Sequence, residues 1–484
     1  MESFQQGRNI ATETLASLVE QARDFAVSNG ILMVPKDAPS PNVFSHAPFT
    51  LFASPFPKSL FQQGFEVQKD FNILVDKISK DHEFLKSSLA SAMEADEFTK
   101  KLFDIYETTQ QEGVTQKISL GLLRSDYMMN PKPGTENQQD FLQGYDIKQI
   151  EINTIASSFG GIGSRLTELH RYIQDSYADS DDKTTEKLPT NCAAQGLGKG
   201  IVTAWNLYGN KSAVVLMVVQ GSENNRVDQR VLEYSIRESN PAVKVIRRNL
   251  QQIEENGELK NDKTLFVDGK EIAVAYFRAG YSPNDYFSVK EWSARVKLER
   301  SRAIKCPTIA YQLVGTKKIQ QVLAEPGVLE RFLDDPGMIA RIRKTFAGLF
   351  SLDNGEDGDK NAQMAIENLD RFVVKPQREG GGNNVYGEAI REVLSKKDGS
   401  RTQYVLMEKI RPPVLKNYIV QVHKNEILEE DVICEFGVFG VVISNGEEIV
   451  KNEAVGHLLR TKSIIHDDGG VAALRAVLDS PCLV

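Results

Sequence analysis

Apolar residues recur at two different spacings along the chain, and the change in spacing predicts a mixed α/β fold. In residues 10–29 and 66–112 they return every three or four positions, which predicts one amphipathic helix and then two or three more. Residues 213–219 are an unbroken apolar run, typical of a strand buried on both faces. Strand and helix patterns then alternate, so residues 213–317 are expected to form a compact open-sheet subdomain.

This subdomain places polar residues where an open sheet binds ligands. Residues 265–267 and 271–277 predict a hairpin, and residues 292–304 predict a helix. Arg278 and Tyr281 come after the second of the two strands. Ligands of open α/β sheets bind beyond the carboxyl ends of the strands. Arg278 and Tyr281 are therefore expected to contact a substrate.

A glycine-rich segment follows residues 371–375, an apolar run that predicts a buried strand. The segment reads Lys375-Pro376-Gln377-Arg378-Glu379-Gly380-Gly381-Gly382-Asn383-Asn384. Its three consecutive glycines let the backbone approach a ligand closely, while Lys375, Arg378 and Glu379 add cations and a carboxylate. This combination suits a polyphosphate held together with a metal ion. A mobile surface loop is the alternative that the segment alone leaves open.

Residues 148–154 alternate apolar and polar positions, which predicts a strand with Glu151 and Asn153 on one face. A carboxylate and an amide oxygen side by side suit Mg²⁺, and the alternative is a solvated strand face. A polar turn with Ser157 and Ser158 follows, and its NH and OH groups are expected to be available to an anion.

Two further cations, Arg124 and Lys317, are candidates to bind an anion. Arg124 lies in a predicted strand at residues 119–128, where its planar guanidinium binds either a ligand oxyanion or the neighbouring Asp126. Lys317 opens a predicted helix, a position where the helix dipole favours an anion. A phosphate bound near Lys317 would explain its placement.

The C-terminal part is predicted to return to the body of the molecule. Residues 403–410 and 433–443 predict strands, and in the second strand Glu435 faces away from Cys434 and Phe436. The last residues are dense in polar groups and end apolar, which predicts a folded tail.

Length and composition bound the class of protein. A chain of 484 residues exceeds one ordinary core, so two or three substructures are expected. The net charge of −8, without a Lys/Arg block, argues against a nucleic-acid partner, and no apolar run approaches the ~20 residues of a membrane helix. The four cysteines form no CxxC pair, which argues against a zinc site and a disulfide scaffold. No signal-peptide pattern is present, so a cytoplasmic protein with reduced thiols is expected.

Several of these segments together resemble the eukaryotic glutathione synthetases. The resemblance rests on the glycine-rich segment, on Gly315-Thr316-Lys317-Lys318 and on shorter stretches in the same order. These stretches are Ser40-Pro41-Asn42-Val43-Phe44, Ile150-Glu151-Ile152-Asn153-Thr154-Ile155, Met407-Glu408-Lys409-Ile410 and Leu458-Leu459-Arg460-Thr461-Lys462. The resemblance implies an ATP-grasp ligase, a homodimer, that joins γ-glutamylcysteine to glycine with ATP and Mg²⁺. It also implies an ATP-grasp body at 1–212 and 318–484, an inserted substrate-binding domain at 213–317, and a lid around residues 355–430.

The resemblance also gives residues their expected roles. Glu151, Asn153 and Glu379 match the metal ligands of the family, and Arg460, Lys375 and Lys317 its catalytic cations. Arg460 is expected to stabilise charge on the reacting carboxyl and phosphoryl groups. The implied nucleotide contacts are Lys317, Lys375, Pro376, Gln377, Arg378, Glu379, Gly380, Gly381, Gly382, Asn383, Asn384, Tyr386, Met407, Glu408, Lys409, Ile410, Glu435, Lys462 and Asp468. The implied substrate contacts are Arg124, Ile155, Ala156, Ser157, Ser158, Glu223, Gln229, Arg278, Ala279, Gly280, Tyr281, Arg460, Val471 and Ala472.

Three positions qualify the resemblance. Ala156 stands where animal members tend to have Ser, and the stretch after Tyr281 lacks an expected Arg. Ala472-Ala473 matches members that use glycine, so glycine rather than β-alanine is the expected acceptor. A homoglutathione synthetase and a nucleotide-binding protein without ligase activity are the alternatives. The complete set of Glu151, Asn153, Lys375, Glu379 and Arg460 favours an enzyme.

Overall fold

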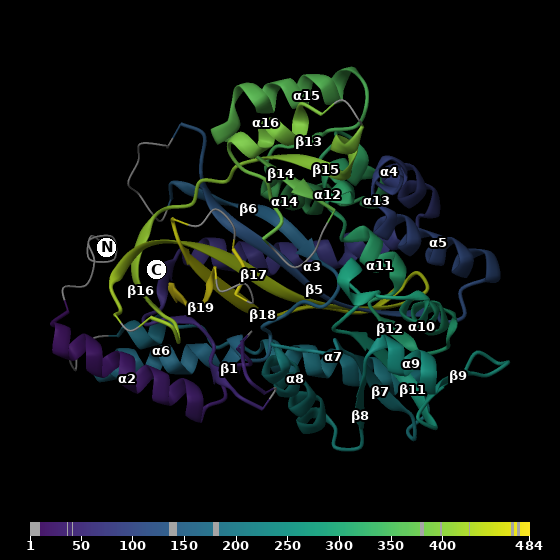
Figure 1. The fold of residues 1–484 in the computed structure, drawn as a ribbon, viewed down its shortest axis with the longest axis horizontal. Coiled ribbons are helices and arrows are strands. Elements are labelled where there is room, and N and C mark those ends of the chain that lie inside the picture. Colours follow the sequence, from purple (N-terminus) through teal and green to yellow (C-terminus); the bar gives the residue numbers. More distant parts are fainter. Residues whose placement is uncertain are drawn as a thin grey trace.

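A seven-stranded sheet crosses the middle of the molecule and carries many of the residues singled out above (Figure 1). This computed structural model describes residues 10–35, 37–40, 42–134, 143–177, 183–377, 382–396, 399–424, 426–465, 469–471 and 475–484. The strands of the sheet lie in the order β16 (Leu415–Val420), β3 (Phe49–Thr50), β19 (Val477–Asp479), β18 (Glu448–Ser463), β17 (Glu429–Asn445), β5 (Ile118–Pro131) and β6 (Tyr145–Asn153). An additional pairing of β16 with β17 closes the first five of these strands into a ring.

The two faces of the central sheet are buried against different helices because side chains alternate along each strand. On β17, Phe436 and Val438 pack into the core that contains α3 (Lys58–Ser79). Phe439 and Val441 pack instead with α7 (Ala193–Tyr208), on the opposite face. Glu435 belongs to this second face, so the predicted alternation around Glu435 is confirmed.

Helices from the N-terminal and middle parts of the chain complete these two layers. They are α2 (Thr12–Ser28), α4 (His82–Ala95), α5 (Glu97–Glu112), α6 (Gly163–Tyr177), α11 (Ile309–Val314), α12 (Lys317–Leu323), α13 (Val328–Phe332) and α14 (Pro336–Thr345), with the short helix η1 (Thr184–Lys187). Asp81 and Asp96 begin α4 and α5 by accepting hydrogen bonds from backbone N–H groups of the first turn. The helical spacing predicted for residues 66–112 is confirmed as parts of three helices.

A second sheet lies below the first in Figure 1 and is mostly parallel at its centre. Its strands are β7 (Val214–Val218), β8 (Val245–Arg248), β9 (Gly257–Leu259), β10 (Leu265–Val267), β11 (Lys270–Phe277) and β12 (Ile304–Cys306). Its helices are α8 (Arg226–Ser239), α9 (Leu250–Asn256), α10 (Val289–Arg300) and η2 (Pro283–Asp285). The predicted hairpin is confirmed, whereas the helix predicted to reach residue 304 ends at Arg300, because Ile304 begins β12.

A small antiparallel sheet with two helices projects above the central sheet (Figure 1). It consists of β13 (Leu349–Ser351), β14 (Phe372–Pro376) and β15 (Tyr404–Glu408), with α15 (Glu356–Glu367), α16 (Glu388–Leu394), η3 (Leu369–Arg371) and η4 (Ser400–Gln403). Its core is separate from the others and contains Leu352, Phe372 and Ile390.

The C-terminal tail is folded back, as predicted. β19 pairs with β3, and β20 (Pro481–Leu483) pairs with β4 (Ser54–Phe56). The two remaining strands, β1 (Leu32–Met33) and β2 (Ser45–His46), form a short ribbon. Among the described residues, no helix has both the length and the apolar character needed to cross a membrane. The predicted mixed α/β class is confirmed by this architecture.

Candidate active site

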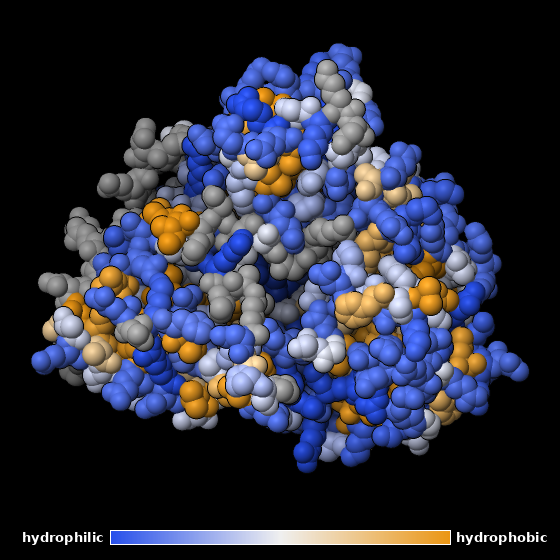
Figure 2. Space-filling model, viewed as in Figure 1, coloured by the Kyte–Doolittle hydropathy of each residue, from blue (hydrophilic) through white to orange (hydrophobic). Residues whose placement is uncertain are grey.

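A cleft of about 200 Å³ lies beside the central sheet, the start of α12 and the end of β14. Figure 2 shows that this face of the molecule is hollowed between the projecting small sheet and the body below. The predicted residues that line the cleft are Arg124, Glu151, Asn153, Ile155, Ala156, Ser157, Ser158, Tyr281, Lys317, Lys375, Gly382, Asn383, Asn384, Glu435, Arg460 and Val471. The chain therefore brings together residues that the sequence scatters over several separate segments.

Strand register explains how four neighbouring strands bring charged side chains into one layer. On β5 and β6, Arg124 lies opposite Asn153, and Asp126 lies opposite Glu151. On β17 and β18, Glu435 lies opposite Arg460. Because side chains two residues apart share a face, these strands present their polar groups toward the same space.

Arg124 and Asp126 form a buried pair. The guanidinium Nε and NH2 donate to the two carboxylate oxygens of Asp126 at 2.6 and 2.8 Å, while NH1 donates to the Ser158 carbonyl at 2.9 Å. Arg124 is 4% exposed and Asp126 is 0% exposed. The ion pair that the sequence left open is therefore present, and Arg124 also lines the cleft.

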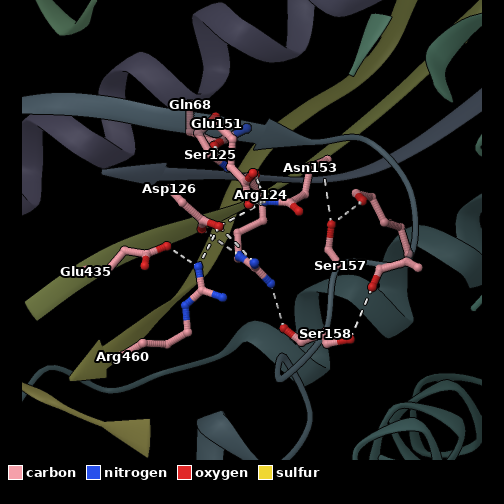
Figure 3. Close-up of polar contacts among 12 residues, drawn as sticks. Gln68, Arg124, Ser125, Asp126, Glu151, Asn153, Ser157, Ser158, Glu435 and Arg460 are labelled. Carbon is pink, nitrogen blue, oxygen red and sulfur yellow. Dashed lines mark hydrogen bonds and ion pairs between the residues drawn. The ribbon is translucent and has the colours of Figure 1, made fainter. Parts of the chain in front are cut away.

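Asp126 holds two other cleft residues in addition to Arg124 (Figure 3). Its Oδ2 accepts a hydrogen bond from Arg460 NH2 at 2.9 Å and another from Asn153 Nδ2 at 2.9 Å. Arg460 donates from the same nitrogen to Glu435. One fully buried carboxylate thus fixes the side chains of three predicted functional residues.

The charges in this layer stabilise one another against burial. Burial by itself would lower the pKa of Arg460, but the carboxylates of Glu435, Asp126 and Glu151 outweigh it and raise that pKa. Burial raises the pKa of Glu435, since the attraction of Arg460 is opposed by the nearby charges of Asp126 and Glu151. Arg460 therefore stays cationic in the cleft.

Gly437 provides the space that this arrangement needs. It lies opposite Asp126 in the pairing of β17 with β5. A Cβ at this position would be 2.6 Å from Asp126 Oδ1, which is too close, and 3.0 Å from Arg124 Cδ, which is a very tight contact. The absence of a side chain at Gly437 is therefore a condition for the buried pair.

Glu151 and Asn153 lie side by side, as the two-residue spacing predicts. Asn153 Nδ2 is 3.3 Å from Glu151 Oε1, and Lys317 Nζ is 2.8 Å from Glu151 Oε2. Burial opposes ionisation of Glu151, but Lys317, Lys375 and Arg460 outweigh it and lower its pKa. An ionised carboxylate beside an amide is a donor set that suits Mg²⁺. No cluster of three His, Cys, Asp or Glu residues that fits a metal is found within the described ranges, and the third predicted ligand, Glu379, lies outside them.

Several backbone N–H groups of the polar turn after β6 are bonded to a side chain of the protein and are not available to an anion. Backbone N–H groups of Phe159, Gly161 and Ile162 all donate to the carboxylate of Asp228, at 2.9, 2.7 and 3.0 Å. Ala156 and Phe159 have φ of 52° and 69°, an uncommon conformation for residues with a side chain. The expectation that these N–H groups are available to an anion is therefore wrong at these three positions, because Asp228 occupies them.

Arg278 supports the same turn. It is 4% exposed and donates to the carbonyls of Ala156 and Ser157 at 3.0 and 2.6 Å and to Ser158 Oγ at 2.8 Å. It does not line the cleft, and neither do Ala279 and Gly280. Arg278 therefore reaches the cleft only through the turn that it holds.

Glu223 and Gln229 form a separate group. Gln229 Nε2 is 2.5 Å from Glu223 Oε2, and Gln229 Oε1 accepts a hydrogen bond from Arg247. Neither residue lines the cleft. Tyr281 does line it, and its hydroxyl accepts a hydrogen bond from Gln220 Nε2 at 3.1 Å.

The small projecting sheet supplies Lys375 to the cleft. Lys375 is 4% exposed, and its Nζ donates to the Ile150 carbonyl at 2.7 Å. The neighbouring Gln377 accepts a hydrogen bond from the Lys318 backbone at 3.1 Å, which joins this sheet to the start of α12. Pro376 ends β14 and does not line the cleft.

The cleft lining does not include six other predicted nucleotide contacts, which are Tyr386, Met407, Glu408, Lys409, Ile410 and Lys462. Lys409 Nζ is 5.5 Å from the centre of the Tyr386 ring, and Asn384 donates to the Tyr386 hydroxyl at 3.3 Å. Met407 is buried on β15, Glu408 pairs with Arg371, and Ile410 follows the strand. Lys462 is buried on β18.

Six predicted residues lie outside the described residues and are not placed here. They are Arg378, Glu379, Gly380, Gly381, Asp468 and Ala472.

Some contributors to the site were not predicted. Ile150, Phe159, Gly469 and Gly470 also line the cleft. Asp126 was considered only as a partner of Arg124, although its two-residue spacing from Arg124 already placed both on one strand face. Asp228 and Gly437 gave no sequence signal, because their roles depend on segments that meet only in the folded chain.

Comparison with known proteins identifies the class of this site. A family model described as "Eukaryotic glutathione synthase, ATP binding domain" matches residues 12–483. The chain is 48% identical to glutathione synthetase of Xenopus laevis, over 98% of each protein, and 46% identical to that of Homo sapiens, over 97% of each. It is 44% identical to a chloroplastic glutathione synthetase of Solanum lycopersicum, over 91% of this chain and 78% of the relative.

A solved structure agrees with these sequence matches. A glutathione synthetase-like effector from Globodera pallida, in its apo form, superposes with a TM-score of 0.78 at 25% identity, covering 98% of each chain. The fold, the charged cleft and these matches define an ATP-dependent ligase. The chain belongs to the eukaryotic glutathione synthetase family.

Proposed function

We propose that the charged cleft is where this ligase makes glutathione, by joining γ-glutamylcysteine to glycine with ATP. The observation that carries the proposal is the layer of Arg124, Asp126, Glu151, Glu435 and Arg460 across four strands. It combines fixed cations, which suit phosphate and carboxylate groups, with a carboxylate–amide pair that suits a metal.

The reaction requires activation of a peptide carboxylate, which is a poor electrophile. We infer that ATP converts it to an acyl phosphate, and that the glycine amine then displaces phosphate. Phosphoryl transfer of this kind depends mainly on positioning and charge stabilisation. Arg460 is the cation for the reacting carboxyl and phosphoryl oxygens, and its contacts with Asp126 and Glu435 fix it before substrate arrives.

Lys317 and Lys375 are proposed to bind the nucleotide phosphates. Glu151, Asn153 and Glu379 would hold Mg²⁺, which, when bound, neutralises charge on the phosphate oxygens. Lys317 pairs with Glu151 at 2.8 Å, so cation and carboxylate are already adjacent where phosphate and metal would meet. Residues 376–384, Tyr386, residues 407–410, Glu435, Lys462 and Asp468 are proposed as the remaining nucleotide contacts. Those on the small sheet belong to a lid around residues 355–430.

The dipeptide is proposed to bind on the side of the polar turn. Arg124, residues 155–158, Tyr281, Val471 and Ala472 are the direct candidates, and the described ones all line the cleft. Arg278 acts on the substrate through residues 156–158, whose carbonyl and hydroxyl groups it holds. Ala279 and Gly280 flank it, whereas Glu223 and Gln229 are proposed as more distant contacts in the 213–317 domain.

Phosphate release from ATP tests this assignment. Release is expected only when γ-glutamylcysteine and glycine are both present, with glutathione formed in equal amount. β-Alanine in place of glycine is expected to react about tenfold more slowly, a discrimination typical of one methylene. Faster turnover with β-alanine would identify a homoglutathione synthetase, and phosphate release independent of the dipeptide would remove the proposed reaction.

A homodimer is proposed from the family, and a cytoplasmic location from the sequence pattern at the N-terminus and from the cysteines. Cys306, Cys434 and Cys482 are buried free thiols and Cys192 is an exposed one, which suits a reducing compartment. Sedimentation of the purified chain tests the dimer, and fractionation of cells tests the location.

A further inference from the structure

A second and larger cavity lies at the other end of the central sheet. Its volume is about 380 Å³, within the range of small-molecule sites. It contains Ser119 near the start of β5, and Gly446 and Glu447 in the turn that joins β17 to β18. The cleft lies toward the opposite ends of these strands, at Arg124, Glu435 and Arg460. The two spaces are therefore separate.

Lys305 is the unusual member of this cavity. It lines the cavity, is 3% exposed, and lies on β12. Within the described part of the chain, its ammonium makes one hydrogen bond, to the Ser301 carbonyl at 2.9 Å, and no ion pair. Buried lysines are normally paired with a carboxylate, because an unpaired charge is costly in a low-dielectric environment. Lys305 thus leaves ammonium protons for a further acceptor.

The carboxylate whose charge acts on Lys305 is that of Glu299, which already has other partners. The carboxylate of Glu299 accepts from Arg295 Nε at 3.0 Å and from the Ile309 N–H at 3.3 Å. Burial lowers the pKa of Lys305 to about 8, and Glu299 offsets only part of this effect. The protein therefore provides incomplete compensation for the charge on Lys305.

The other cations that line the cavity do not share this property. Lys80 pairs with Asp76 at 2.6 Å, and Arg300 pairs with Glu112. Lys117 is exposed to solvent. The buried apolar walls include Tyr106 and Ile309. The cavity is therefore lined by a small apolar group among polar residues, which include the carboxylates of Glu112, Glu299 and Glu447. Lys305 is the buried cation of this lining whose charge is compensated only in part.

We propose that this cavity is a binding site for a small organic carboxylate with an apolar body, whose head group pairs with Lys305. A single ammonium matches a singly charged carboxylate better than a doubly charged phosphate ester. The apolar part of the lining, made by Tyr106, Val114, Ile309 and Ala310, would contact the body of the ligand. This site does not depend on the reaction proposed for the cleft.

Calorimetric titration of the full-length protein with benzoate tests the proposal, in the presence of saturating ADP and Mg²⁺ so that the cleft is occupied. Benzoate is expected to bind at millimolar concentration or better, and neutral benzamide about tenfold more weakly, because it lacks the charge-assisted hydrogen bond. Lys305→Met is expected to weaken benzoate binding by about tenfold or more, whereas Lys117→Met at the exposed rim leaves it unchanged. Equal binding to wild type and Lys305→Met, or no binding to wild type, would overturn the proposal. Tighter binding of phenyl phosphate than of benzoate would overturn the choice of a carboxylate.

A chemical footprint covers the case in which Lys305→Met does not fold. The wild-type protein is treated with a limiting amount of an acetylating N-hydroxysuccinimide ester, and acetylation of each lysine is measured by mass spectrometry. Benzoate is expected to protect Lys305 and to leave Lys117 labelled as before. Labelling of Lys305 that is unaffected by benzoate would contradict the proposed contact.

Discussion

The cleft and the second cavity lie at opposite ends of the central sheet and differ in whether their buried cations are paired with carboxylates. In the cleft, Arg124, Arg460 and Lys317 each lie within hydrogen-bond distance of a carboxylate. In the cavity at the other end, the ammonium of Lys305 has a backbone carbonyl as its single hydrogen-bond partner among the residues that the structure describes. The first arrangement is complete without a ligand and keeps its cations in fixed positions, as a catalytic site requires. The second arrangement compensates the charge of Lys305 only in part, so a bound ligand is expected to supply the rest.

Removal of the carboxylate that the cleft residues share is expected to have the largest effect. Asp126→Asn keeps the size of the side chain but removes the negative charge and one of the two acceptor oxygens that Arg124 and Arg460 share. We expect turnover to fall about 100- to 1000-fold, a loss comparable with removal of a transition-state donor, and stability to fall by about 3 kcal/mol. Phosphate release and urea unfolding measure the two effects.

Asp70→Asn is the matched control for Asp126→Asn. Asp70 is 5% exposed and pairs with Arg341 in the same two-bond manner, at 2.7 and 3.0 Å, but it does not line the cleft. It is expected to lose stability while turnover stays near the wild-type value. If both variants lost turnover equally, Asp126 would have a structural role alone.

The same substitution at one buried lysine of each region tests the difference between the cleft and the cavity directly. Lys317→Met removes the partner of Glu151 and a proposed phosphate contact, so we expect about a 100-fold loss of turnover. Lys305→Met removes a poorly compensated charge, so we expect unchanged turnover and stability that is equal or about 1 kcal/mol higher. Parallel kinetic and unfolding measurements on both variants check this. A large destabilisation by Lys305→Met would show that the protein itself depends on that charge.

Gly437→Ala tests how closely the cleft network is packed. Its methyl group would lie 2.6 Å from Asp126 Oδ1 and displace the buried pair. We expect about a tenfold loss of turnover and a loss of about 1–3 kcal/mol of stability, typical of overpacking. Gly221→Ala is the control, since the nearest atom to its methyl group is 3.8 Å away. Equal effects of the two alanines would mean that Gly437 is not critical for spacing.

His457 differs from the buried cations of the cleft and the cavity, because burial keeps its side chain neutral. It is 2% exposed, lies against the rings of Phe61 and Phe65, and burial lowers its pKa to about 3. An unfolded histidine takes up its proton near pH 6.5, so stability is complete above that pH and is lost as pH falls toward 3.

His457→Leu is expected to reduce the acid dependence of stability by up to about 1.4 kcal/mol per pH unit, the contribution of one proton. Urea unfolding between pH 4 and 7 measures it, with His423→Leu at an exposed position as control. An unchanged slope in His457→Leu would contradict a neutral buried His457. This is the smallest of the expected effects at neutral pH.

The sequence correctly predicted which side chains share a face of a strand, because this depends only on local spacing. Two-residue alternation correctly paired Glu151 with Asn153 and turned Glu435 away from Cys434. It did not reveal that Asp126 serves both Arg124 and Arg460, because β5 and β18 meet only through β17. The sequence also predicted that N–H groups of the turn after β6 are available to an anion. Three of them donate instead to Asp228, which lies on α8 beside the second sheet.

The pairing of β19 with β3 and of β20 with β4 has a consequence for biosynthesis. When the ribosome has made β3 and β4, their partners do not yet exist, so these strand edges stay unpaired through most of translation. The central sheet closes only after residues 477–479 of β19 have emerged, and the separate pairing of β4 with β20 needs residues 481–483. A nonsense mutation just before them would therefore open a gap inside the sheet instead of trimming its border, and the nascent chain needs protection from aggregation until synthesis reaches them.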